Sequence, residues 1–342
     1  MQTFFSEDHR KHFPQAELSG GQFVTPFERP SRVEYVRAEL LARGMGKILA
    51  PGAADMGPIE AICDTGYLAF LESAFAEWKA DGNAGELIAG CIAPRGMRTD
   101  RIPDNIDGKA GYYCHASETA ITAGTWEAVL SSAASAQAAQ RAVAGGAGAA
   151  FALCRPPGHH ATADQYGGYC FVNNAAMAAQ MFAEGGARVS VLDIDFHHGN
   201  GTQNIFYDRE DVLFASLHGD PMEAYPYFLG HEDERGAGAG EGANRNYPMK
   251  PGTAWDEWGA ALDDALGRIR DHGSEALVVS LGVDAFKDDP ISFFKLQSED
   301  FTRAGAKIAT LGLPTLFVME GGYAIEAVGI NTVNVLAGFE GA

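Results

Sequence analysis

Short runs of apolar, β-branched residues alternate along this chain with longer segments in which apolar residues recur every three to four positions. The short runs are typical of buried parallel strands, and the longer segments of helices that pack one face on a sheet. The predicted strands are 149–153, 189–194, 212–217, 276–283 and 313–319. The predicted helices are 126–144, 174–183, 255–271 and 300–310. The pattern therefore predicts an α/β fold around a doubly wound, mostly parallel sheet.

Two parts of the chain do not follow this alternation. Residues 81–111 contain glycines, two prolines and mixed charges without sustained periodicity, so we expect a long ordered loop there. The first fifty residues give no clear pattern either. Because no repeat, low-complexity tract or linker divides the sequence, we expect a single domain over 1–342.

Composition narrows the class of protein. Of the 342 residues, 46% are hydrophobic and 20% are charged, and no apolar run approaches the eighteen residues of a membrane span. The first ten residues include Glu7, Asp8 and His9, where a secretory signal would have a basic start and an apolar core. We therefore expect a cytoplasmic protein that does not bind a membrane.

Charge and cysteine content exclude further classes. The five cysteines form no CxxC pair, so neither a disulfide framework nor a thiolate metal site is indicated. The formal net charge of −20 would repel phosphate backbones and disfavours nucleic acid as a partner. A small cationic ligand fits this charge better.

A polar motif follows each of the five predicted strands. The motifs are, in chain order, CRPPGHH, DIDFHHGN, SLHGDP, GVDAFKDDP and EGGY. Because ligands bind at the carboxyl ends of strands in an open parallel sheet, residues far apart in the sequence should meet there. We therefore expect one site that all five motifs share.

Asp195, His197 and Asp284 are the candidate metal ligands of this site. Two side chains two positions apart on an extended segment point the same way, so Asp195 and His197 can share an ion, and Asp284 would complete the set. Three protein ligands leave a position for water, which is typical of a catalytic zinc site. An Asp₂His set also accepts iron(II) or cobalt(II).

The remaining polar residues suggest acid–base chemistry. His159 and His160 follow a rigid Pro-Pro-Gly turn and are candidate general bases near a hydrolytic water. Asp193 and Asn200 flank the metal motif at positions suited to orient the two imidazoles. Tyr323 follows two glycines, and its hydroxyl could donate to a carbonyl oxygen.

Taken together, the motifs CRPPGHHA, GGYCFVNN, DIDFHHGNGTQ, SLHGDP, GVDAFKDDPISFF and EGGY resemble those of histone deacetylases and, more narrowly, of bacterial acetylpolyamine amidohydrolases. The stretches FSEDH, AELSGG, GYYCHASETAI and GTWEA resemble the polyamine enzymes specifically, so the resemblance covers nearly the whole chain. It implies the arginase-deacetylase fold, with a central, mostly parallel sheet of about eight strands between helical layers. It also implies a zinc-dependent amidohydrolase that converts acetylputrescine, acetylcadaverine or acetylspermidine to acetate and free amine.

The resemblance assigns roles to the same residues. Asp195, His197 and Asp284 match the family's zinc ligands, and Tyr323 matches the residue that polarises the substrate carbonyl. His160 matches the general base and acid. His159, paired with Asp193, matches its electrostatic partner. Asn200 stands where some members have Asp, which should keep the pKa of His160 low and favour its role as a base.

Further positions are implied by the resemblance alone. Tyr169 and Tyr225 match aromatic walls of the substrate tunnel, and three acidic positions match contacts to the distal amine, namely Glu17, Asp107 and Glu118. Asp107 is shorter than the Glu expected there. A loop like 81–111 forms the homodimer interface of the polyamine enzymes and shapes the tunnel entrance. A structural potassium site is implied around Asp193, Asp195, His197, Ser216 and Leu217.

Three other functions remain to be weighed. An arginase-like ureohydrolase needs a second metal ion and further carboxylates, but Gly282 stands where such an enzyme would have another Asp. A protein-lysine deacetylase would share the zinc site and differ only at the rim, where the acidic positions argue against it. A non-catalytic amine or acetate sensor would have lost a ligand or the tyrosine, whereas Asp195, His197, Asp284 and Tyr323 are all present.

Overall fold

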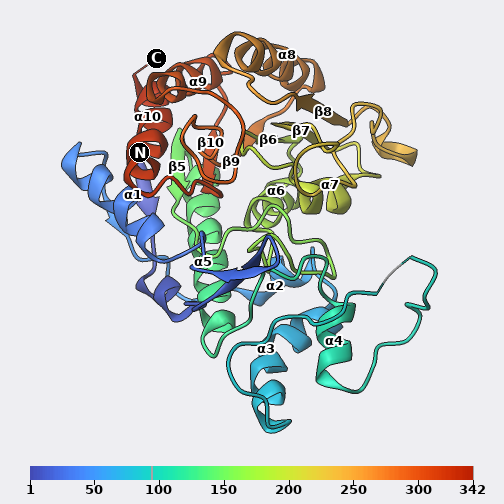
Figure 1. The fold of residues 1–342 in the computed structure, drawn as a ribbon. Helices are drawn as coiled ribbons and strands as arrows, with labels where there is room; N and C mark the ends of the chain where they lie inside the picture. The colour runs from blue at the N-terminus through green and yellow to red at the C-terminus, as the bar shows by residue number, and fades with distance from the viewer. Residues whose placement is uncertain (94, 342) are drawn as a thin grey trace.

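A single sheet of eight parallel strands organises the fold, which we describe from a computed structural model that covers residues 1–93 and 95–341 (Figure 1). The strand order is β4-β1-β5-β10-β9-β6-β7-β8. The strands are β1 (Gln2–Phe4), β4 (Ile48–Leu49), β5 (Ala149–Ala152), β6 (Val189–Asp193), β7 (Val212–Gly219), β8 (Asn244–Met249), β9 (Ala276–Leu281) and β10 (Thr315–Met319). The prediction of a mostly parallel sheet of about eight strands is confirmed.

Helices cover both faces of this sheet (Figure 1). They are α1 (Ser31–Ala42), α2 (Met56–Glu60), α3 (Thr65–Ala80), α4 (Ile106–Tyr112), α5 (Thr125–Ala144), α6 (Asn174–Glu184), α7 (Asn200–Phe206), α8 (Trp255–His272), α9 (Ser298–Ala309) and α10 (Ile325–Glu340), with short 3₁₀ helices at Glu7–Lys11 and Gly238–Gly240. None of the helices in the described ranges is long and apolar enough to span a bilayer. The five predicted strands and four predicted helices agree with the observed ones to within two residues at each end.

The two faces of the sheet belong to two separate cores because side chains alternate along each strand. On β10, Leu316 and Val318 pack with α3, α5 and α6, whereas Phe317 and Met319 pack with α1, α8, α9 and α10. Both faces are apolar, so these strands read as continuous hydrophobic runs. Burial on both sides leaves the carboxyl edge of the sheet as the place for polar chemistry.

The first fifty residues contain short elements that the sequence pattern does not reveal. β1 and β4 extend the sheet beyond β5 by two short parallel strands. A separate antiparallel hairpin consists of β2 (Glu17–Ser19) and β3 (Gln22–Val24), joined by Gly20 and Gly21. Both glycines have positive φ, 56° and 78°, which a tight hairpin turn of this kind requires. This hairpin places Glu17 at the site described below.

The predicted loop over 81–111 is shorter than expected, because its last part is helical. α4 begins at Ile106, where the Asn105 side chain accepts a hydrogen bond from the Asp107 amide and caps the helix. Ile106 and Ala110, four residues apart, are buried under this turn. A helix of seven residues is too short to give a clear period in the sequence, which explains the difference.

Candidate active site

Asp195, His197 and Asp284 meet at the carboxyl edge of the sheet, as the motif positions predict. β6 and β9 are neighbouring strands, and the three side chains follow directly after them. Their candidate ligand atoms all lie within 4.8 Å of one another. His197 Nδ1 lies 2.9 Å from Asp284 Oδ2 and 3.3 Å from Asp195 Oδ1. The two carboxylates are fully buried.

Glycines make room for these carboxylates. A Cβ atom at Gly282 would lie 2.0 Å from Asp195 Oδ2, and one at Gly321 would lie 2.5 Å from the same oxygen. Gly321 also donates its amide to Asp195 Oδ2 at 2.8 Å. A further Asp side chain at position 282, as in a dinuclear site, would collide with the Asp195 carboxylate. The local packing therefore supports one metal ion rather than two.

The electrostatics of the group favour a bound cation. Burial, together with the Asp195 charge, raises the pKa of Asp284 to about 7, because two carboxylates are held close together away from water. Burial disfavours the charged form of His197, but Asp195 and Asp284 outweigh it and raise its pKa to about 10. Two oxygen donors and one imidazole nitrogen, with His197 facing a cavity, fit a divalent ion with an open coordination position.

His159 and His160 lie beside this group, with their ring centroids 4.0 Å apart. His159 Nδ1 is 2.9 Å from Asp193 Oδ2, and His160 Nδ1 is 2.7 Å from Asn200 Oδ1. Burial opposes the charge on His159, but Asp193 and Asp195 raise its pKa to about 10. Burial and the neighbouring His159 lower the pKa of His160 well below its usual value. The two adjacent imidazoles therefore differ in charge, as the Asp and Asn partners suggest.

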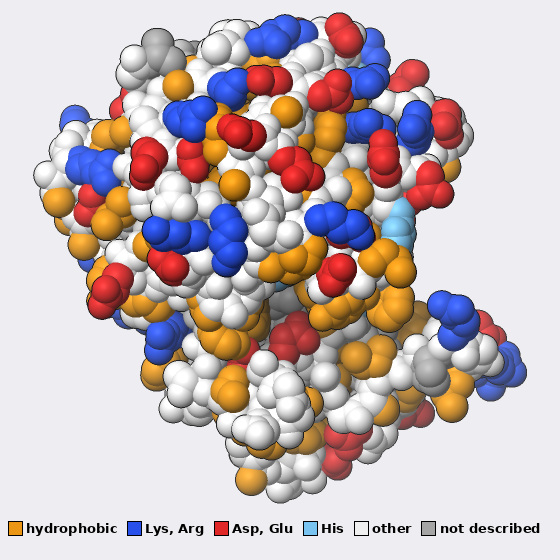
Figure 2. All heavy atoms as spheres, turned by 45° about the horizontal axis from the view of Figure 1, so that its top comes forward, with side chains coloured by type: hydrophobic (Ala, Val, Ile, Leu, Met, Phe, Trp, Pro, Cys, Tyr) orange, Lys and Arg blue, Asp and Glu red, His pale blue; other side chains and the backbone are white. Residues whose placement is uncertain are grey.

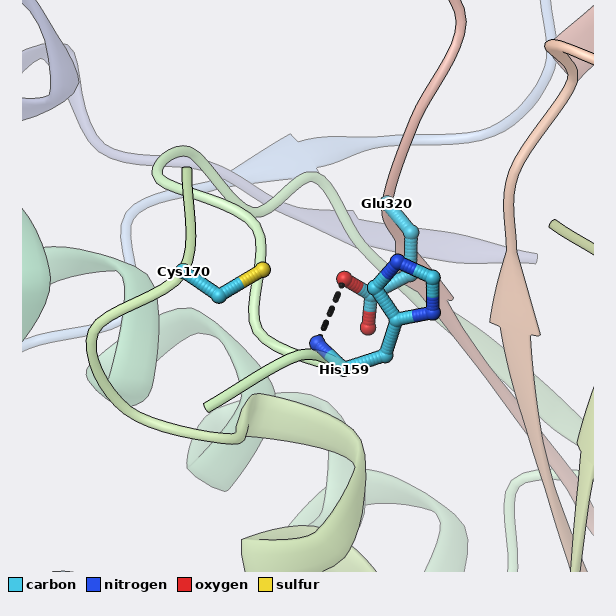
Figure 3. A group of neighbouring side chains, drawn as sticks. All are labelled: His159, Cys170 and Glu320. Atoms are coloured by element: carbon cyan, nitrogen blue, oxygen red, sulfur yellow. Dashed lines mark hydrogen bonds between the residues drawn. The ribbon is translucent and has the colours of Figure 1, made fainter. Parts of the chain in front are cut away.

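Glu320 fixes the turn that carries the two histidines. Its Oε2 accepts hydrogen bonds from the amides of Gly158 at 2.7 Å and His159 at 3.2 Å. Figure 3 shows the carboxylate against the His159 backbone, with the ring on the side away from Cys170. Burial raises the pKa of the Cys170 thiol well above its usual value, and its Sγ lies 3.2 Å from the Gly168 carbonyl oxygen. The Glu320 carboxylate thus acts on the backbone of the turn, while the Cys170 thiol contacts a neighbouring carbonyl oxygen.

A cavity of about 360 Å³ opens above the metal-ligand group. His160, His197 and Tyr323 line it together with Tyr169 and Tyr225. The Tyr225 ring lies 4.9 Å from His160, and the Tyr169 ring lies 5.7 Å from Tyr323, centroid to centroid. The aromatic side chains thus form walls around the polar group.

An unusual backbone conformation holds Tyr169 in the cavity wall. Tyr169 has a φ of 66°, which is unusual for a bulky residue. The Thr119 hydroxyl oxygen accepts a hydrogen bond from the Tyr169 amide at 2.9 Å. A Cβ atom at the preceding Gly168 would lie 2.4 Å from the His160 ring. Such local strain is found at functional sites, where surrounding contacts hold it in place.

Acidic side chains also line the cavity. Glu17 accepts hydrogen bonds from the Tyr169 hydroxyl at 3.1 Å and the Phe27 amide at 3.0 Å. Glu118 accepts the Gly168 amide at 2.8 Å. Burial raises the pKa of Glu17 to about 7 and also raises that of Glu118. Figure 2 shows a hollow in the surface with acidic side chains among hydrophobic ones, while the basic side chains on that face are mixed with acidic ones.

Asp107 does not join this group. It is exposed in the first turn of α4 and is not among the residues that line the cavity of the single chain. One chain by itself therefore does not bring Asp107 to the cavity, and its contact with the distal amine stays a prediction. The family resemblance identified Asp107 in the sequence, but the position of α4 in the fold determines where its side chain lies.

Several residues around the cavity are not indicated by the sequence motifs. Glu223 and Tyr227 line the cavity from the segment after β7, on either side of Tyr225, and Phe293 lines it from the segment after β9. His115 lies behind the cavity, where its Nδ1 is 3.3 Å from the Tyr225 hydroxyl. A signal for Glu223 was its position two residues before Tyr225, in the segment that follows the predicted strand 212–217.

The backbone expected to hold potassium lies next to the metal-ligand group. Asp193 on β6 pairs in register with Ser216 on β7, and Leu217 follows Ser216 on the same buried strand. The segment from Asp193 to His197 leaves β6 at this point. The five residues expected around potassium therefore lie on two neighbouring strands and on the segment that follows β6.

Comparisons with known proteins show which family shares this sequence and fold. The model of the histone deacetylase domain family matches residues 26–339. The chain is 55% identical over its full length to acetylpolyamine amidohydrolase 1 of Pseudomonas aeruginosa, and 54% identical to the acetylpolyamine amidohydrolase of Mycoplana ramosa, of which it covers 99% and 100%. The crystal structure of acetylpolyamine aminohydrolase from Burkholderia pseudomallei superposes with a TM-score of 0.93 at 42% identity, over 99% of this chain and 98% of that one.

The contact at Gly282 gives a test of the metal-ligand group. We expect Gly282→Ala to lower the affinity for a divalent ion by roughly 10–100-fold, because the new methyl group would displace the Asp195 carboxylate. The matched control is Gly267→Ala on α8, where a Cβ atom would meet open space. Competition with a chelator measures the affinity of both variants. Unchanged affinity in Gly282→Ala would show that Asp195 is not a ligand in this geometry.

Proposed function

The chain belongs to the histone deacetylase family of metal-dependent amidohydrolases, and on that premise we propose that it hydrolyses acetylated polyamines and small acetylated diamines. Acetylputrescine, acetylcadaverine and acetylspermidine are the substrates we propose, with acetate and the free amine as products. One observation carries the proposal. The carboxylates of Glu17 and Glu118 line the same aromatic cavity as His160, His197 and Tyr323. Such a cavity accepts an extended cationic amine with its acetyl group at the base.

Asp195, His197 and Asp284 would hold the divalent ion. Zinc held there would supply Lewis-acid polarisation of the acetyl carbonyl and of the attacking water, and the same donors also suit iron(II) or cobalt(II). His160 has a low pKa, so it is neutral and able to take the proton of the water as its oxygen bonds to the acetyl carbon. The same ring then gives a proton to the amine nitrogen as the C–N bond breaks.

The neighbouring residues support this proton transfer. Asn200 orients the His160 ring through the 2.7 Å contact at Nδ1. His159, paired with Asp193, keeps positive charge next to the reaction centre, where negative charge develops on the acetyl oxygen. Tyr323 borders the cavity, and its hydroxyl would donate a hydrogen bond to that oxygen. Tyr169 and Tyr225 would enclose the alkyl chain of the substrate.

The proposed enzyme also includes a structural ion and a partner subunit. A potassium ion would bind the main-chain oxygens around Asp193, Asp195, His197, Ser216 and Leu217. A homodimer would form through the segment 81–111, which would bring Asp107 of the partner subunit near the tunnel entrance. We also propose a cytoplasmic location, where the four buried, unpaired cysteines stay reduced.

The direct test is a comparison of substrates on the purified protein. We expect acetylputrescine, acetylcadaverine or acetylspermidine to give a kcat/KM at least about 100-fold above that of an acetyl-lysine peptide, since the peptide offers no terminal ammonium to Glu17 and Glu118. Steady-state release of acetate measures all four rates. Efficient cleavage of the peptide would instead support a protein-lysine deacetylase.

Charge recognition by Glu118 can be separated from its packing role. Glu118→Gln keeps an acceptor for the Gly168 amide but removes the charge. An ammonium about 4 Å from a carboxylate interacts by about 4 kcal/mol at an effective dielectric of about 20, of which desolvation removes a large part. We expect kcat/KM for acetylcadaverine to fall about tenfold, which corresponds to about 1.4 kcal/mol. A neutral alkyl acetamide of equal length should be unaffected. Equal losses on both substrates would mean that Glu118 acts by packing.

The raised pKa of Glu17 predicts a pH dependence. Burial holds this pKa at about 7, so the carboxylate is charged above pH 7 and becomes neutral as the pH falls. The substrate ammonium stays protonated throughout this range. We therefore expect the ratio of kcat/KM for acetylcadaverine to that for the neutral acetamide to decrease as pH falls through 7, while proton transfers common to both substrates cancel. In Glu17→Gln this decrease should be smaller, because Glu118 is then the one of the two carboxylates left to titrate. A flat ratio in the wild type would exclude Glu17 from charge recognition.

A further inference from the structure

The turn from Glu320 to Ala324, which carries Tyr323, is anchored on its carbonyl side by a buried arginine. Arg32 Nε donates to the Gly322 carbonyl oxygen at 2.7 Å, and its Nη2 donates to the Glu320 carbonyl oxygen at 2.5 Å. The guanidinium also lies 4.7 Å from the centroid of the Tyr323 ring. These contacts fix the start of the turn and one face of the ring.

The amide side of the same turn is anchored by a carboxylate that the reaction does not use. Asp289 Oδ2 accepts hydrogen bonds from the amides of Tyr323 at 2.7 Å and Ala324 at 3.1 Å. Its Oδ1 accepts the amide of Ile291 at 3.2 Å. Asp289 is 6% exposed, so its charge is held away from water and these three amide donors stabilise it.

Asp289 therefore joins two loops of the site. It belongs to the segment after β9, which also carries Asp284 and, at Ile291 and Phe293, part of the cavity wall. Tyr323 belongs to the segment after β10. Gly322 has a φ of 131°, a conformation that a side chain would disfavour, so the turn takes a shape that regular secondary structure does not maintain. A specific acceptor is needed to hold the Tyr323 amide in that shape.

We propose that Asp289 is a positioning residue for the hydrolysis, which fixes the backbone of Tyr323 so that the phenol faces the acetyl oxygen in the cavity. The inference rests on the proposed function, because Tyr323 acts on that oxygen only in the hydrolysis. Asp289 itself accepts hydrogen bonds from the backbone and acts through Tyr323. A displacement of about 1 Å at a reacting group can lower a rate about 100-fold, so the anchor matters for kcat.

A double-mutant cycle on the metal-loaded enzyme tests this role. We expect Tyr323→Phe to lower kcat by roughly 10²–10³-fold. Asp289→Ala should lower kcat about 100-fold, with KM within about threefold of the wild type. In the Tyr323→Phe background, Asp289→Ala should cost less than about threefold more, because the phenol it positions is already absent. Equal losses in both backgrounds, or a normal kcat in Asp289→Ala, would overturn the inference.

Two further variants separate positioning from folding. Asp289→Asn has nearly the same shape but places an amide NH₂ against a backbone donor, so it should lose roughly tenfold in kcat. If Asp289→Ala does not fold, Asp289→Asn takes its place in the double-mutant cycle with Tyr323→Phe. The matched control is Asp288→Ala, since Asp288 is the exposed neighbour of Asp289. This control should keep kcat and KM, and a loss equal to that of Asp289→Ala would contradict the inference.

Hydrogen exchange gives a readout that does not depend on turnover. The amides of Tyr323 and Ala324 should exchange faster in Asp289→Asn than in the wild type, and at the wild-type rate in Asp288→Ala. A wild-type protein that cleaves no acetylated amine would refute the proposed function, whereas unchanged exchange in Asp289→Asn would refute the anchor. The two failures are therefore distinguishable.

Discussion

The site depends on one electrostatic constraint, namely that two carboxylates and an imidazole are buried together at the carboxyl edge of a parallel sheet. Asp195 and Asp284 repel each other there, and burial removes the water that would screen them. A divalent cation relieves this repulsion. The surrounding backbone is shaped to the same end, because Gly282 and Gly321 leave space for Asp195, and the Gly321 amide donates to it. Packing and charge thus converge on one ion-binding position.

Burial and the neighbouring groups also give the two adjacent histidines different charges. His159 and His160 have the same side chain and are equally buried, yet one faces the carboxylate of Asp193 and the other the amide of Asn200. A carboxylate stabilises the imidazolium, whereas a neutral amide does not offset the loss of water. The pair therefore offers a charged ring and a neutral base side by side. Glu320 holds the turn on which both depend.

The wall of the cavity is built from segments outside the sheet. Glu17 comes from the β2–β3 hairpin, Glu118 from the segment between α4 and α5, and Tyr225 from the segment after β7. The sheet fixes the reaction centre, while these connections set the shape and charge of the cavity. The connections can therefore change the shape and charge of the cavity without moving the residues at the sheet edge.

The sequence alone determined the reaction centre, because hydrophobic runs mark the buried strands and the residues after them must meet at one edge. The tertiary structure decided what periodicity cannot encode. The hairpin around Glu17 and the helix α4 are too short to give a repeating pattern. The motif resemblance pointed to Glu17 and Asp107 alike, and packing decided that Glu17 lines the cavity and that Asp107 does not. The contact between Asp289 and the Tyr323 amide joins residues 34 positions apart in two irregular segments. Their geometry depends on side-chain hydrogen bonds across the fold, which local sequence does not specify.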